Sequence, residues 1–443
     1  MVISFLNTYV FGPALPIAVF TSGIIMAAKL GFFPFLKPAK TIAPVLRGGG
    51  EGNSPLKALS VALAGTLGVG NIAGVAGAIS LGGPGAVLWM WLSALLAMVL
   101  KYSEIMLAVK YRRSITENGK RRFTGGAFAY MSAHGHRRLG FVFALLCVIT
   151  AITMGSIVQS NSMTSAFQQS FGARPPVVGG LTAILTMIII SGGFSSVAGI
   201  TARAVPLFCV IYTAVSLYII LTNTSRLPDV IGMIFNDALS FRSVGTGVAS
   251  YGMIRAMRFG VARGILSNEA GSGTSPTAHA GSNTSSPCEQ GFFGIVEVFI
   301  DTVLLCSMTA FVILLSGKYS GSDAMIVSID AFGVFIGRAA PYFISLSIGF
   351  FAFATIICWA VYGLEALRFL VKDYFPKARL GSTLLAYKSL YSLSVFLGGI
   401  IPAALMWELS DLSVGVMTTV NCAYLLYLSG EIKRDTDNYF SQT

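Results

Sequence analysis

Two glycine-rich stretches interrupt long apolar segments of this chain. They are AGTLGVGN at 64–71 and SNEAGSGTSP at 267–276. Each lies inside a segment that is otherwise long and apolar enough to cross a membrane. Non-helical backbone at membrane depth is tolerated only where it is buried in protein or lines a water-filled cavity. Two such breaks, in corresponding positions of two halves, indicate the substrate and ion site of a secondary transporter.

The composition is that of a protein surrounded by lipid. Of the 443 residues, 54% are hydrophobic and only 11% are charged, whereas a soluble domain carries about 25% charged residues. The formal net charge is +12. The basic residues lie in loops between apolar segments, as in cytoplasmic loops of membrane proteins, and form no stripe for nucleic acid. We therefore expect a lipid bilayer as a partner and no nucleic acid.

Hydropathy predicts an all-α membrane protein with about eleven transmembrane helices. Most of the 30 lysines and arginines fall in loops that share one side if the N-terminus is outside, so we expect N-out and C-in. The expected spans lie near 11–30, 56–80, 84–110, 139–169, 176–195, 203–222, 256–282, 291–316, 341–371, 384–406 and 410–429.

The two breaks divide the spans into one extra helix and two sets of five. An odd number of helices in each set gives the two sets opposite topology, which is the inverted repeat of many secondary transporters. The expected units are an N-terminal helix with an inside loop, two five-helix repeats and a cytoplasmic tail. They cover residues 1–55, 56–222, 223–429 and 430–443.

Several segments resemble the alanine or glycine:cation symporter family. The similarity extends over residues 13–430 and is carried by GTLGVGNIAGVAGAISLGGPGAVLWMW (65–91), FGVARGILSNEAGSGTSPTAHA (259–280), VFIDT (298–302), FAFATIICW (351–359) and MGSIVQSNS (154–162). The resemblance implies a leucine-transporter-type fold with one extra helix. It also implies sodium-driven uptake of alanine, glycine or D-alanine across a bacterial or archaeal plasma membrane. We expect sodium as the coupling ion, no organic cofactor and a monomer.

The first break has the chemistry to bind an amino acid and a cation. Its glycines permit non-helical backbone, which frees amides near Val69 and Gly70 to bind a carboxylate at the start of the next half-helix. Freed carbonyls on the other side, at Ala64 and Leu67, suit a hard cation. The expected substrate contacts in this break are Thr66, Gly68, Val69, Gly70 and Asn71. The alternative is simple helix packing through the G-x-x-x-G pair Gly70 and Gly74.

The second break contributes Ser267, Asn268 and Gly271 to the expected substrate site. Glu269 is an intramembrane acid and is therefore a functional candidate. It either anchors the unwound segment through hydrogen bonds, which we favour, or attracts a cation. We expect His279 to serve in packing or gating.

The resemblance adds three residues to the site. It places Gln159 against the substrate, implies that Trp359 walls a small pocket, and makes Thr355 a sodium ligand beside the Ala64 and Leu67 carbonyls. The family usually has a Ser–Thr pair where this chain has Ala354–Thr355. One side-chain oxygen is therefore missing, which favours weak sodium binding or coupling to protons instead.

Other intramembrane polar residues are expected to be structural. Glu297 and Asp301 stand four apart on one helix face and are expected to brace the bundle. Lys101, Tyr102 and Glu104 near the inner end of a span are expected to act as snorkelling anchors.

The sequence thus predicts a sodium-coupled symporter and not an enzyme. The first alternative is a proton-coupled amino-acid symporter. Two alternatives come from other classes. An intramembrane serine hydrolase would use Ser272 or Ser275 with His279 and needs a close Ser–His contact. A channel would show a repeated filter or a ring of charges, and no such pattern appears in the sequence.

Overall fold

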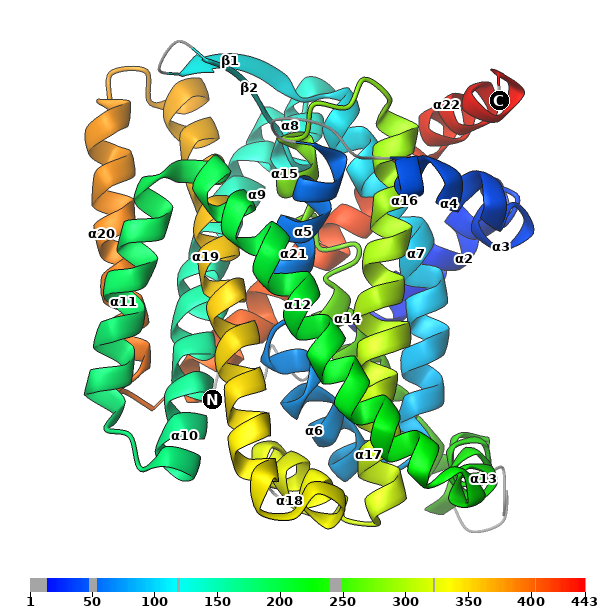
Figure 1. Ribbon diagram of the computed structural model, residues 1–443. Coiled ribbons are helices and arrows are strands. Elements are labelled where there is room, and N and C mark those ends of the chain that lie inside the picture. The colour runs from blue at the N-terminus through cyan, green and yellow to red at the C-terminus, as the bar shows by residue number, and fades with distance from the viewer. Residues whose placement is uncertain are drawn as a thin grey trace.

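The computed structural model describes residues 14–47, 54–117, 120–239, 248–321, 323–402 and 404–442. Long helices cross the molecule side by side, and one small β-hairpin caps one end (Figure 1). The predicted all-α membrane fold is confirmed, whereas the number of spans stays a prediction. Among the described residues, six helical segments are long and apolar enough to cross a membrane: Ala86–Lys110, Arg137–Phe171, Gly193–Thr222, Pro287–Ser316, Ala324–Tyr374 and Leu405–Tyr427.

The first expected repeat begins with a discontinuous helix. The predicted span 56–80 is divided into α5 (Pro55–Thr66), the 3-10 turn η2 (Val69–Asn71) and α6 (Ala73–Gly82). The helices that follow are α7 (Ala86–Lys110), α9 (Arg137–Thr150), the π-helical segment η3 (Ala151–Val158), α10 (Gln159–Phe171), α11 (Pro175–Ser191) and α12 (Gly193–Thr222).

The second expected repeat also begins with a discontinuous helix. The predicted span 256–282 consists of α14 (Val248–Asn268), an unwound segment and the short α15 (Pro276–Ala280). Glu269, Gly271 and Gly273 of the unwound segment have φ values of 53°, 76° and 74°, and glycine adopts such values at little cost. The helices that follow are α16 (Pro287–Val298), the π-helical segment η5 (Phe299–Cys306), α17 (Ser307–Ser316), α19 (Ala340–Tyr374), α20 (Leu380–Gly398) and α21 (Ala404–Tyr427).

Helix α7 packs closely against α14 and α16 because glycines on these two helices allow it. A Cβ atom on Gly260 of α14 would lie 2.2 Å from the carbonyl oxygen of Ala86, and one on Gly291 of α16 would lie 2.6 Å from the Tyr102 ring. Small residues at helix interfaces let backbones approach in this way. Side chains of α7 therefore reach the unwound segment of the second repeat.

The two ends of the bundle carry different short elements (Figure 1). At one end lie α13 (Leu227–Ala238) and α18 (Ala324–Ile336), which the hydropathy analysis does not predict. At the other end lie α4 (Pro38–Arg47), the hairpin of β1 (Arg113–Glu117) and β2 (Lys120–Thr124), and α8 (Ala127–Ala133). We refer to them as the α18 end and the hairpin end. The extra N-terminal helix is α2 (Leu15–Lys29), and a single turn, α3 (Phe33–Leu36), connects it to α4.

The segment expected as a cytoplasmic tail is an ordered helix, α22 (Ser429–Gln442), at the hairpin end. Glu431 of α22 lies 2.6 Å from the Lys110 ammonium and accepts hydrogen bonds from Tyr111 at 2.5 Å and His134 at 3.1 Å. Partial burial raises the pKa of Glu431, but the bonds to Lys110, Tyr111 and His134 outweigh it and lower the pKa to about 2. These contacts fix α22 against the ends of α7 and α8.

Candidate functional site

The first break presents carbonyl oxygens to a buried hydroxyl group. The Thr355 Oγ1 atom on α19 lies 3.0 Å from the carbonyl oxygen of Ala64 and 3.4 Å from that of Leu67. It also lies 3.0 Å from the carbonyl oxygen of Phe351 in its own helix. A hydroxyl has one proton to donate, so it satisfies only one of these three acceptors at a time. The remaining oxygens fit the ligand set of a hard cation such as sodium.

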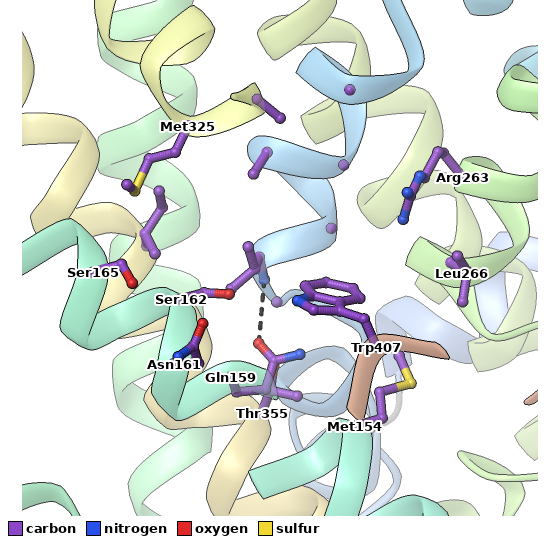
Figure 2. A pocket seen from close by; sticks show the side chains of 18 of the residues that line it. Met154, Gln159, Asn161, Ser162, Ser165, Arg263, Leu266, Met325, Thr355 and Trp407 are labelled. Carbon is purple, nitrogen blue, oxygen red and sulfur yellow. Dashed lines mark hydrogen bonds between the residues drawn. The ribbon is translucent and has the colours of Figure 1, made fainter. Parts of the chain in front are cut away.

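A cavity of about 420 Å³ borders this break. It extends along α6 toward the α18 end of the bundle, and side chains of α10, α14 and α21 surround it (Figure 2). The α6 side of the wall is made of small residues, Ala73, Gly74 and Gly77. Its other lining residues include Gly65, Ser80, Met154, Asn161, Ser162, Ser165, Arg263, Leu266, Glu269, Asp323, Met325, Ile348 and Trp407.

Six of the residues predicted for the site line this cavity. They are Thr66, Gly68, Val69, Gly70, Gln159 and Thr355. The Gln159 Oε1 atom accepts a hydrogen bond of 3.4 Å from the backbone amide of Val69, drawn as a dashed line in Figure 2. Gly68 lies close to both polar side chains: a Cβ atom there would be 3.0 Å from Thr355 Oγ1 and 3.2 Å from Gln159 Oε1.

Asn71 and Ser267 lie behind the cavity and join the two breaks. The Asn71 side-chain amide donates to Asp301 Oδ1 at 2.7 Å and to Ser267 Oγ at 3.0 Å. Ser267 in turn donates to Asp301 Oδ2 at 2.9 Å. Neither Asn71 nor Ser267 is among the residues that line the cavity. Asp301 therefore braces the bundle, in the role that its helix position predicts.

Asn268 and Gly271 also lie away from the cavity. Asn268 accepts the amide of Ala270 at 3.0 Å and donates to Thr302 at 3.1 Å. The Gly271 carbonyl accepts a hydrogen bond of 3.0 Å from Asn421 of α21. In this conformation both residues shape the unwound segment.

The position of Trp359 differs from the expected pocket wall. Its indole N–H donates to Glu269 Oε1 at 3.1 Å, and a Cβ atom on Gly155 would lie 2.3 Å from Trp359 Cβ. Trp359 is fully buried against η3 and does not line the cavity. The indole that does line the cavity is that of Trp407 on α21 (Figure 2).

Glu269 has the contacts of an anchor. Besides the bond from Trp359, it accepts one of 2.6 Å from Thr274 in the same unwound segment. Its φ value of 53° places it in the left-handed region, which is uncommon for a residue other than glycine. Glu269 also lines the cavity, so one carboxylate connects the second break with the cavity.

The snorkelling expected for Lys101, Tyr102 and Glu104 is wrong. All three side chains have 0% exposure. The Lys101 ammonium lies 3.2 Å from Glu297, and Tyr102 shares a hydrogen bond of 2.8 Å with Thr436 of α22. The neighbouring glycines of α16 bring that helix close enough to cover these groups, so they do not reach the surface.

Two charged residues of the cavity, Arg263 and Asp323, carry no role in the sequence analysis. Arg263 lies within the family-like segment 259–280, after a glycine and two apolar residues. The sequence therefore places it in a span but does not show where its side chain points. Figure 2 shows its side chain beside the cavity. Asp323 caps the N-terminus of α18 by accepting the amide of Met325 at 2.8 Å.

The geometry disfavours a serine hydrolase. The His279 imidazole contacts Glu297 at 3.1 Å through Nε2 and Gln290 at 2.7 Å through Nδ1. Ser272 bonds to the Glu269 carbonyl at 2.6 Å. Within the described residues, neither the Ser272 nor the Ser275 hydroxyl has a hydrogen bond to the His279 imidazole, and no cluster of three His, Cys, Asp or Glu residues suits a metal ion.

Comparisons with known proteins agree with this architecture. A model of the sodium:alanine symporter family matches residues 1–443. The sodium/alanine symporter AgcS of Methanococcus maripaludis is 33% identical over 448 residues, which cover 97% of this chain and 95% of that protein. The probable sodium/glutamine symporter GlnT of Bacillus subtilis is 30% identical over 449 residues, with 100% and 91% covered.

Among solved structures, a manganese transporter of Eremococcus coleocola in complex with an aromatic bis-isothiourea compound has the same fold. The TM-score is 0.53 at 12% sequence identity, with 84% of this chain and 76% of that chain covered. At this identity the likeness concerns the fold alone. The family match over the whole length decides the assignment: this chain belongs to the sodium:alanine symporter family, a family of membrane transporters.

Proposed function

We propose that this protein takes up a small neutral amino acid, such as alanine, glycine or D-alanine, together with sodium. The observation that carries the proposal is the convergence of the Ala64 and Leu67 carbonyls on the Thr355 hydroxyl, at the edge of the cavity. Unwound carbonyls at the end of a half-helix are the sodium ligands of transporters built from broken helices. Sodium bound there would hold α5 against α19 and so couple ion binding to the state of the site.

The amino acid is proposed to bind beside the sodium ion, at the start of α6. Backbone amides near Val69 and Gly70 and the positive end of the half-helix favour a carboxylate. The Val69 amide donates to the Gln159 side-chain oxygen in this conformation. A substrate carboxylate that takes its place on the amide would free that oxygen to accept a hydrogen bond from the substrate ammonium group. Both polar ends of an amino acid thus find partners within one turn of the break.

The cavity points to uptake by alternating access. It extends toward the α18 end, and the basic residues Lys40 and Arg113 belong to α4 and β1 of the hairpin end. Cytoplasmic loops carry an excess of lysine and arginine. We therefore orient the hairpin end, with the C-terminal helix, toward the cytoplasm, so that the cavity opens to the outside.

Substrate size is proposed to depend on Gly74. A Cβ atom on Gly74 has open space within 4 Å, and the residue lines the cavity. Gly74→Leu is expected to weaken competition by glutamine at least about tenfold more than competition by glycine, because added methylenes exclude larger side chains. Inhibition of labelled alanine uptake by unlabelled amino acids measures this. Gly199→Leu is the control, since Gly199 also has open space but lies on α12 away from the cavity. Equal losses for glycine and glutamine would contradict this placement.

The direct test of the proposed function is uptake of labelled alanine into proteoliposomes under separate ion gradients. We expect an inward sodium gradient at constant pH to drive accumulation, and a proton gradient without sodium to drive none. The opposite result would establish the proton alternative. One observation favours that alternative. The family usually has a Ser–Thr pair at 354–355, and Ala354 leaves Thr355 as the one hydroxyl available for sodium.

A further inference from the structure

A lysine ammonium lies at the carbonyl end of the second broken helix. The Lys101 Nζ atom donates to the carbonyl oxygen of Asn268, the last residue of α14, at 2.8 Å. It lies 3.2 Å from Glu297 Oε1 and 3.9 Å from Glu104 Oε1. All three charged side chains have 0% exposure. Three oxygen atoms from α14, α16 and α7 thus surround one fixed cation.

The two carboxylate oxygens depend on this ammonium. Glu104 Oε1 and Glu297 Oε1 are buried and have no hydrogen-bond partner, so Lys101 is their neutralising contact. The second oxygen of Glu104 accepts the amide of Gly273 at 3.0 Å. Lys101 and Glu104, one turn apart on α7, therefore hold the end of α14 and the middle of the unwound segment at Gly273. The cation also compensates the negative end of the α14 helix dipole.

The first break differs from the second in the side chain that faces its freed carbonyl oxygens. At the carbonyl end of α5, the group that faces Ala64 and Leu67 is the neutral hydroxyl of Thr355. Both breaks expose carbonyls that favour a cation. Only the second is filled by a side-chain cation of the described chain.

We propose that Lys101 is a tethered cation that takes the place of a second mobile ion, so that one sodium ion moves with each amino acid. This inference rests on the proposed sodium symport. Lys101 acts as a positioning residue, since it touches the unwound segment and not the cavity. Without the ammonium, the Asn268 carbonyl and the two carboxylate oxygens would form an oxygen-rich hole suited to a hard cation.

The coupling ratio of the natural protein is the first test. The measurement uses proteoliposomes with the membrane voltage clamped at zero and an outward tenfold alanine gradient. The quantity to determine is the inward sodium gradient at which there is no net alanine flux. A tenfold sodium gradient balances the alanine if one sodium ion moves, whereas a roughly threefold gradient suffices if two move. We expect the first value. The second would overturn this inference but leave sodium symport intact, and absence of sodium-driven flux would overturn both.

The second test replaces the cation. Lys101→Met is expected to change the sodium dependence of alanine uptake from hyperbolic to sigmoidal, because a second sodium ion must enter the vacated position. The double variant Lys101→Met/Glu297→Gln removes a carboxylate from the hole, so its curve should return toward hyperbolic. Lys110→Met is the matched control, since Lys110 lies on the same helix but pairs with Glu431 at the hairpin end.

A hyperbolic curve for Lys101→Met at unchanged uptake would overturn the proposal, as would equal sigmoidal curves for the single and double variants. If Lys101→Met yields no folded protein, the coupling ratio of the natural protein decides alone.

Discussion

Thr355→Val is expected to raise the sodium concentration for half-maximal alanine uptake by about 10- to 100-fold. Valine has nearly the shape of threonine, so the packing of α19 against α5 is kept while the hydroxyl is lost. Thr355 Oγ1 lies 3.0 Å from the Ala64 carbonyl oxygen, at the proposed sodium position. A hydrogen bond or ligand contact to a charged group contributes about 1.5–3 kcal/mol, and each 1.4 kcal/mol corresponds to a tenfold change in affinity.

The matched control for this variant is Thr355→Ser, which keeps the oxygen and loses only a methyl group. We expect its half-saturating sodium concentration to stay close to that of the natural protein. Initial rates of labelled alanine uptake across a sodium series, at equal amounts of reconstituted protein, measure both variants. The same sodium dependence for Thr355→Val and the natural protein would remove Thr355 from the ion site.

The two breaks are the part of the architecture that the sequence predicts well. Glycine and polar residues at 64–71 and 267–276 cannot be lipid-facing helix without leaving polar groups unsatisfied, so their effect on the backbone is strong and local. The structure divides both spans at these positions. The hairpin that follows α7 is also predictable from the sequence. The Asn118–Gly119 pair is a strong hairpin signal, but hydropathy alone does not register it.

The walls of the cavity are harder to predict because they depend on how each helix is rotated. Trp359 and Trp407 both lie in apolar helices, and hydropathy does not distinguish a side chain that faces a cavity from one that faces a neighbouring helix. The structure turns Trp359 toward Glu269 and Trp407 toward the cavity. The π-helical segments Ala151–Val158 and Phe299–Cys306 add to this uncertainty, since an added residue in a turn shifts every side chain that follows.

The burial of Lys101 shows a second limit of sequence patterns. A lysine about ten residues from the end of a span is compatible with snorkelling. What excludes it here is the close approach of α16, where a Cβ atom on Gly294 would lie 3.0 Å from the Lys101 side chain. A signal was present in the sequence, because Lys101, Glu104 and Glu297 are ionisable residues of opposite charge inside apolar segments, and such residues pair with one another.

Gly68→Ala is expected to reduce alanine uptake about 30-fold although it adds a single methyl group. The new Cβ would lie 3.0 Å from Thr355 Oγ1 and 3.2 Å from Gln159 Oε1, so both side chains must move away from their partners in the first break. Displacing two hydrogen-bonding groups by this route costs about 2 kcal/mol. Backbone strain is not the cause, because Gly68 has φ −112° and ψ −156°, which alanine also adopts.

Gly77→Ala separates this effect from a general loss of glycine in the cavity wall. Gly77 lines the same cavity, but its added Cβ would lie 3.6 Å from Ala324 Cβ, an ordinary contact. We expect Gly77→Ala to transport alanine at close to the natural rate and with the natural sodium dependence. For Gly68→Ala, both the alanine and the sodium concentrations for half-maximal uptake should rise, because Gln159 and Thr355 move together. A rise in only one of the two would show that the substrate and ion positions do not share Gly68, and natural values for both would remove the first break from the transport site.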